Sequence, residues 1–118
     1  MIINRNELLQ LKSIFDKISN NNINIYTQYK FLKLKKIYDD EVIIYQEQYN
    51  RILQYCEYTD DSNLLKIKPE FMEQCRNDIQ LMNEITVQLP DIYFSLDELE
   101  NLQLSFYELE ILMPFIKI

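Results

Sequence analysis

The sequence has 118 residues, and among them there is no glycine, no histidine, no tryptophan and no alanine. Without histidine the chain has no imidazole to serve as a general base, a metal ligand or a pH switch. Without glycine it cannot form a phosphate-binding P-loop, a dinucleotide-binding fingerprint or a nucleophile elbow. These absences exclude most familiar enzyme sites. We therefore expect a protein that is not an enzyme and that binds no cofactor.

The positions that glycine and alanine leave are filled mainly by isoleucine, asparagine and tyrosine, with 17, 11 and 9 copies. The codons of these residues are AT-rich, so the composition indicates an AT-rich genome, such as that of a low-GC bacterium or its phages. An apolar content of 47% and a charged content of 26% are typical of a globular protein. No apolar run approaches the roughly 18 residues of a membrane helix, and the first residues lack the apolar core of a signal peptide. We expect one soluble domain over residues 1–118 with no membrane contact, in the bacterial cytoplasm or associated with a virion.

Apolar residues recur at helical spacing in three segments, about 5–19, 25–58 and 69–85. The second segment carries a seam at nearly heptad spacing from Phe31 to Cys56, and it would be a long central helix. An antiparallel pairing of the second and third segments keeps one constant register: Cys56 with Cys75, Ile52 with Ile79, and Tyr49 with Met82. The sequence therefore predicts a mainly α fold, a three-helix arrangement around a long central helix that is paired with an antiparallel helix.

The seam of the central helix is longer than the third segment can cover. Its first half, Phe31 to Val42, needs another partner. The first helix and a second copy of the chain are both candidates, so a homo-oligomer through the central helix remains open.

The last segment, 86–118, has a different pattern that predicts short extended pieces and a short C-terminal helix. Val87–Leu89 and Ile92–Phe94 flank a proline and favour extended backbone, and Met1–Ile3 is a candidate strand partner. Capping boxes at Ser95–Glu98 and Ser105–Glu108 each predict the start of a short helix. Pro114 should stop or kink the second one.

Three sets of side chains could carry chemistry, and each has a simpler structural interpretation. Cys56 and Cys75 are too few for a zinc site and suit small buried positions, although a disulfide between them is left open. The tyrosines concentrated between Tyr26 and Tyr58 could stack on bases or form a binding surface, but they also suit a core. The acids of 39–41 and 60–61 lack the spacing of a cation site. We assign no catalytic residue and no metal ligand.

Charge is strongly segregated along the chain. Residues 1–36 carry 7 basic and 2 acidic side chains, whereas residues 37–118 carry 5 basic and 17 acidic ones. The basic candidates for an interaction surface begin the central helix: Lys30, Lys33, Lys35 and Lys36. They could meet nucleic acid or an acidic partner, or they could pack against the acidic C-terminal third of the same chain.

The acidic candidates follow residue 96, and an apolar tail lies beside them. The candidate acids are Asp97, Glu98, Glu100, Glu108 and Glu110. Phe115 represents the apolar tail of 113–116. An extended acidic surface suits a basic protein surface.

Two stretches of the chain, taken in their order, have a character that can be compared with known protein families. One is the long charged helix from Gln28 to Leu53, and the other is the extended Pro-containing piece from Leu89 to Leu99, with its continuation to Ile116. In their order and character they resemble a family of small proteins of unknown function that phages and prophages of low-GC bacteria encode. This chain departs from that family in a shorter middle loop without the usual glycine. The resemblance implies a phage context and carries over no functional residue.

From these observations we expect a non-enzymatic phage protein that acts through protein–protein contacts, as a virion assembly component or as an inhibitor of a host or defence factor. The alternative is a nucleic-acid-associated accessory protein that uses the basic patch from Lys30 to Lys36.

Overall fold

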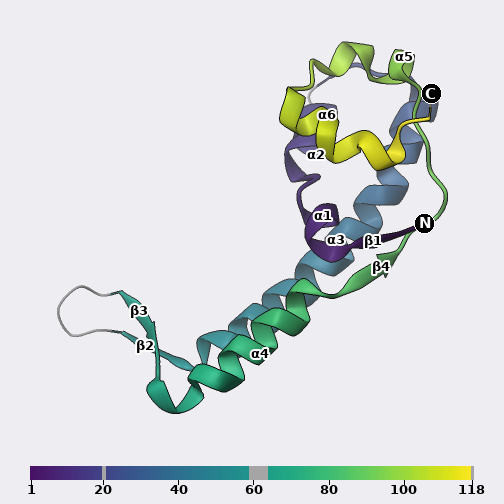
Figure 1. Ribbon diagram of the computed structural model, residues 1–118. Helices are drawn as coiled ribbons and strands as arrows, with labels where there is room; N and C mark the ends of the chain where they lie inside the picture. Colours follow the sequence, from purple (N-terminus) through teal and green to yellow (C-terminus); the bar gives the residue numbers. More distant parts are fainter. Residues whose placement is uncertain (20, 59–63, 118) are drawn as a thin grey trace.

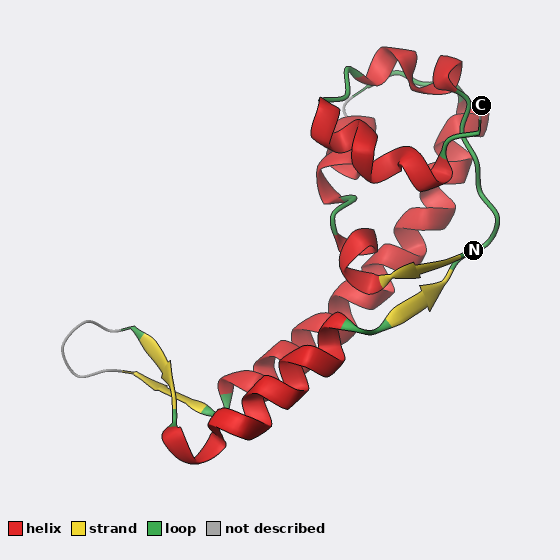
Figure 2. Ribbon diagram, viewed as in Figure 1, coloured by secondary structure: helices red, strands yellow, loops and turns green. Residues whose placement is uncertain are grey.

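The protein is an elongated, mainly helical molecule (Figures 1 and 2). We call the part that holds the larger core the head; it contains the N-terminal segment, the first half of the long helix and the C-terminal segment. The projecting part that holds the smaller core is the stalk. The computed structural model describes residues 1–19, 21–58 and 64–117. Its extents are 53 × 29 × 22 Å and its radius of gyration is 18.0 Å. A compact chain of this length would have a radius of gyration of about 13–14 Å. The difference reflects the stalk, which projects from a compact head.

Helix α3 (Ile25–Leu53) runs from the head into the stalk and joins them. The Asn24 side chain caps it by accepting a hydrogen bond from the Tyr26 amide. Its 29 residues span about 43 Å. The prediction of a long central helix is confirmed, but its end at residue 58 is wrong. The helix stops at Leu53 because Cys56–Tyr58 (β2) forms antiparallel strand pairs with Leu65–Ile67 (β3) at the far end of the stalk.

The second half of α3 and helix α4 (Met72–Asn83) form the stalk. Pro69–Phe71 makes a 3₁₀ turn (η1) before α4, so the predicted third helix, 69–85, is α-helical over a shorter range. The two helices pack antiparallel as predicted, around a small core of Ile52, Cys75 and Met82. The predicted seam is only partly buried, since Tyr49 and Ile79 are 48% and 42% exposed. Two helices alone cannot enclose every seam position.

The head contains the main core. Strand β1 (Ile2–Asn4) pairs antiparallel with β4 (Thr86–Gln88), as the sequence suggested, and it leads directly into α1 (Arg5–Leu9). The predicted helix 5–19 is in fact two helices, because the chain turns at residues 10–11 before α2 (Lys12–Ser19) begins. This turn lets Leu8, Leu11 and Ile14 all point into the core.

Side chains of the head cover the first half of the α3 seam. Phe31 and Leu34 are buried among residues of α2 and of the C-terminal segment. The Phe31 ring stacks on Phe94 with 4.2 Å between centroids, and Phe15 of α2 lies 5.1 Å from Tyr38. The partner of this half of the seam is therefore the chain's own N- and C-terminal segments.

The C-terminal segment wraps over the head as short helices (Figure 2). They are α5 (Leu96–Leu99), the 3₁₀ turn η2 (Glu100–Leu102), α6 (Phe106–Leu112) and the 3₁₀ turn η3 (Met113–Phe115). Both predicted capping boxes are present with both of their hydrogen bonds. Pro114 tightens the end of α6 into η3, as expected.

The tail that follows α6 belongs to the core. Phe94 and Ile116 form a single parallel bridge, and Phe115 is only 2% exposed. Whether the apolar tail is core or interface is open from the sequence, and for Phe115, a candidate interaction residue, the structure places the side chain in the core of the head. In this fold Phe115 is not available to a partner.

Candidate functional site

Lys30 and Glu98, two of the sequence-based candidates, contact each other. The Lys30 ammonium donates hydrogen bonds to both Glu98 carboxylate oxygens, at 2.8 and 3.1 Å, and to the Tyr93 carbonyl at 3.0 Å. Glu98 also accepts from the Ser95 amide in the capping box. One carboxylate thus caps α5 and ties it to the start of α3. This contact supports the intramolecular interpretation of the charge segregation.

Glu108 is also held inside the head. Its side chain is 7% exposed and it forms an ion pair with Lys17 of α2. It also accepts a hydrogen bond from the Ser105 amide, while the Ser105 hydroxyl accepts one from the Glu108 amide. Burial alone would raise the pKa of Glu108, but the Lys17 and Ser105 hydrogen bonds outweigh it and lower the pKa to about 2. Glu108 is a structural anion and not a surface acid.

Lys17 also contacts Gln103, two residues before the Ser105 cap of α6. Its ammonium donates to the Gln103 carbonyl at 3.0 Å, and Gln103 has a positive φ of 51°. Glycine is the usual residue in this left-handed region, and this chain has none. The Lys17 contact holds the α5–α6 connection in a conformation that its own sequence does not favour.

The other lysines of the basic patch lie on the outer side of α3. Lys35 pairs with Asp39 one turn later at 2.9 Å, and the Lys33 ammonium lies 4.8 Å from the centre of the Tyr29 ring. Lys36 is exposed. The four lysines therefore do not form one patch, since Lys30 lies against the head while the other three face outward.

The remaining acidic candidates, Asp97, Glu100 and Glu110, are exposed. Glu110 borders a groove of about 550 Å³ between α6 and α1, together with Glu7 of α1. The other residues that line this groove are Gln10, Tyr107, Ile111, Met113 and Pro114. Acidic and apolar groups meet here on one face of the head.

Phe106 is the feature of this face that the sequence reasoning missed. It is 95% exposed at the first position of α6, and Tyr107 beside it is 60% exposed. Phe106, Glu110 and Met113 follow each other at helical spacings of four and three, so they share one stripe, on the side away from the buried Glu108. That spacing was visible in the sequence. We call Phe106, Tyr107, Glu110 and Met113, with Glu7 across the groove, the α6 face.

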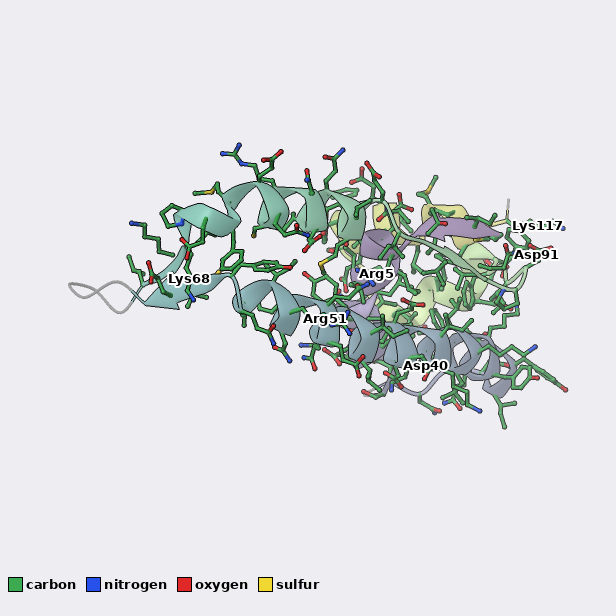
Figure 3. All side chains as sticks on the ribbon, turned by 90° about the horizontal axis from the view of Figure 1, so that it is seen from below. Arg5, Asp40, Arg51, Lys68, Asp91 and Lys117 are labelled. Atoms are coloured by element: carbon green, nitrogen blue, oxygen red, sulfur yellow. The ribbon has the colours of Figure 1, made fainter. Side chains whose placement is uncertain are left out.

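Arg5 was also missed, and it lies at the junction of head and stalk (Figure 3). It is 1% exposed, donates to the Gln48 side-chain oxygen at 2.6 Å, and has its guanidinium carbon 5.2 Å from the centre of the Tyr45 ring. Its Nε and Nη2 atoms have no hydrogen-bond partner within the described part of the chain. No carboxylate pairs with it there, so Arg5 holds α1 against α3 through one amide and one aromatic ring.

The cysteines and acid clusters offer little for catalysis. Cys56 and Cys75 are free thiols, and burial, with smaller contributions from Cys56 and Asp78, raises the pKa of Cys75. Within the described ranges no group of three or more Cys, Asp or Glu side chains is arranged to hold a metal ion. Asp60 and Asp61 lie outside those ranges.

Comparisons with known proteins give no family for this fold and site. The chain matches no protein-family model, no curated protein and no solved structure. Among the described helices, none combines the length and the apolar character needed to cross a membrane.

Proposed function

We propose that this chain is a non-enzymatic interaction protein that binds a basic protein surface through the α6 face. The observation that carries the proposal is Phe106, a large aromatic side chain that is 95% exposed beside an acidic groove. Aromatic and methionine side chains are enriched in the buried centres of protein interfaces, whereas charged groups suit the rim. Phe106, Tyr107 and Met113 would be the anchors, and Glu7 and Glu110 the acidic rim.

Charge supports a basic partner. The formal net charge of the chain is −7, and Asp97 and Glu100 add exposed acids on the same C-terminal segment as α6. Such a surface attracts a cationic partner and repels nucleic acid. In the phage context that the sequence resemblance implies, the partner would be a virion component during assembly or a host or defence factor that the protein inhibits.

The test is a comparison of variants in one binding experiment. Tagged wild-type protein and the Phe106→Ala/Met113→Ala variant are used to capture proteins from a bacterial lysate, and the captured proteins are quantified by mass spectrometry. We expect basic proteins that bind the wild type and are lost with the variant. The matched control is Leu81→Ala on α4, an apolar side chain that is 62% exposed outside the α6 face.

A second comparison tests the acidic rim of the α6 face. The captured proteins should also be lost in high salt and with Glu7→Gln/Glu110→Gln, because exposed charge pairs are screened. If the α6-face variant captures the same proteins as the Leu81→Ala control, the proposal is wrong.

The alternative function, a nucleic-acid accessory protein, has less support. Lys30 and Lys35 are already engaged in ion pairs, so only Lys33 and Lys36 of the proposed patch lack an acidic partner within the described structure. A gel-shift titration at low salt decides between the two functions, since binding by micromolar protein that Lys33→Gln/Lys36→Gln abolishes would favour the alternative.

A further inference from the structure

The outer side of α3 carries a second exposed stripe, distinct from the α6 face. It consists of residues at alternating spacings of four and three: Ile25, Tyr29, Leu32, Lys36, Asp39 and Ile43. The four apolar members are between 55% and 71% exposed. Figure 3 shows α3 along one edge of the molecule, with side chains around Asp40 directed away from the head and from α4. The stripe therefore runs along the helix without cover from the described segments.

Charge along this stripe changes sign at its centre. Lys36 lies in its first half and Asp39 in its second half, and the exposed neighbours have the same signs: Lys33 in the first half, Asp40 and Glu47 in the second. Lys36, Asp40 and Glu47 form no ion pair with any described residue. Asp39 pairs with Lys35, but both side chains are about half exposed, and such pairs contribute little.

We propose that a second copy of this chain packs antiparallel against the outer stripe of α3. With the two-fold axis between Ile37 and Tyr38, Leu32 lies opposite Ile43 of the second copy, and Lys36 lies opposite Asp39 of the second copy. Each contact then occurs twice, as a two-fold interface requires. Leu32 and Ile43 make the apolar contacts, twice in the dimer, while Tyr29 lies opposite Gln46 of the second copy. The lysines of each helix meet the aspartates of the other.

Self-complementarity is the reason to assign a second copy to this stripe. A parallel arrangement would place lysine against lysine and aspartate against aspartate, which is unfavourable in a helix pair. A uniformly charged partner would match one half of the stripe and repel the other. Only an antiparallel α3 offers the inverted order of the same charges at the same spacing.

The proposal is independent of the α6 face. Figures 1 and 3 place α6 and α3 on opposite sides of the head, so the dimer leaves both α6 faces open. The two heads would lie toward opposite ends of the paired helices. A dimer of this kind presents two equal binding faces, and a partner with repeated sites would bind it with increased avidity.

The first experiment measures association by sedimentation velocity over a range of protein and salt concentrations. We expect a monomer–dimer equilibrium that weakens as salt increases. Lys36→Glu should weaken dimerisation roughly 10- to 100-fold, because it replaces two attractive contacts by two repulsive ones. Adding Asp39→Lys to that variant should restore most of the affinity, since the exchanged charges again face each other.

The second experiment tests the register by disulfide crosslinking in a Cys56→Ser background. Leu32→Cys and Ile43→Cys are made separately, oxidised alone and then oxidised as a mixture. An antiparallel pair predicts crosslinked dimer in the mixture and none in either variant alone, because equal residues lie about 16 Å apart along the axis. Crosslinking of Leu32→Cys alone would indicate parallel helices and overturn the proposal. A strict monomer at high micromolar concentration, or a dimer that Lys36→Glu leaves unchanged, would overturn it as well.

Discussion

Lys17 and Glu108 are 91 positions apart in the chain and form an ion pair that joins α2 to the first turn of α6. The same lysine holds the Gln103 carbonyl, and the same glutamate completes the capping box with Ser105. One contact therefore fixes the position of α6, which carries the proposed binding face. Ion pairs between the basic N-terminal third and the acidic C-terminal segment therefore stabilise the fold, and they account for part of the charge segregation.

The stability of the protein should depend on pH through Glu108. Its pKa is lowered from 4.5 to about 2, so the unfolded chain binds a proton there in a pH range where the folded chain does not. The stabilisation is present in full well above pH 4.5 and is lost as the pH falls toward 2, with a total of roughly 3 kcal/mol. Urea unfolding at a series of pH values measures it.

The matched variants are Glu108→Gln and Glu110→Gln. Glutamine at 108 can still serve the capping box but cannot pair with Lys17 as a charge. We expect Glu108→Gln to be destabilised at neutral pH and to lose much of the acid-dependent decrease, and Glu110→Gln on the exposed side of the same helix to behave as the wild type. An unchanged pH dependence in Glu108→Gln would contradict this account.

Arg5 should be replaceable by an apolar residue of similar length. Its buried guanidinium has one hydrogen bond to Gln48 and a contact with the Tyr45 ring, but Nε and Nη2 are unpaired in the described structure. A buried charge without a carboxylate is costly, whereas its aliphatic stem fills space. We expect Arg5→Ala to lower the free energy of unfolding by about 2–4 kcal/mol through the cavity, and Arg5→Met to change it by less than about 1 kcal/mol in either direction. Equal losses in both variants would show that the charge itself is required.

The two cysteines should differ in their reaction with a thiol reagent. Cys75 is 1% exposed and burial raises the pKa of its thiol, so the reactive thiolate is both rare and enclosed. In a Cys56→Ser variant, Cys75 should react at least about tenfold more slowly in buffer than in urea, because it must wait for the stalk to open. In a Cys75→Ala variant, the half-buried Cys56 should react faster than Cys75 does. Rapid labelling of Cys75 in the native protein would contradict the packing of α3 on α4.

Local signals in the sequence were enough for much of the fold. The capping boxes at Ser95 and Ser105 depend on residues three positions apart, and the pairing of α3 with α4 follows from two apolar seams. The end of α3 at Leu53 was not visible, because strand pairing between β2 and β3 competes with a helical pattern that continues to Cys56. Local periodicity carries no information on such competition.

The candidate site was less predictable than the fold. Their chemistry makes Glu98, Glu108 and Phe115 candidates for a surface, but each contacts a segment that is distant in sequence. Exposure depends on those long-range contacts. The burial of Arg5 likewise depends on α3 passing beside α1.

Phe106 should contribute nothing to the stability of the fold, and this distinguishes a binding residue from a core residue. Its side chain is 95% exposed, so its truncation removes almost no buried surface, and Phe106→Ala should change the free energy of unfolding by less than about 0.5 kcal/mol. Phe94 is fully buried against Phe31, and Phe94→Ala should cost about 3–5 kcal/mol. Denaturant unfolding of both variants measures the contrast. A loss of stability in Phe106→Ala comparable to that in Phe94→Ala would mean that Phe106 is covered by other parts of the protein in solution. The α6 face could not then be open to a partner.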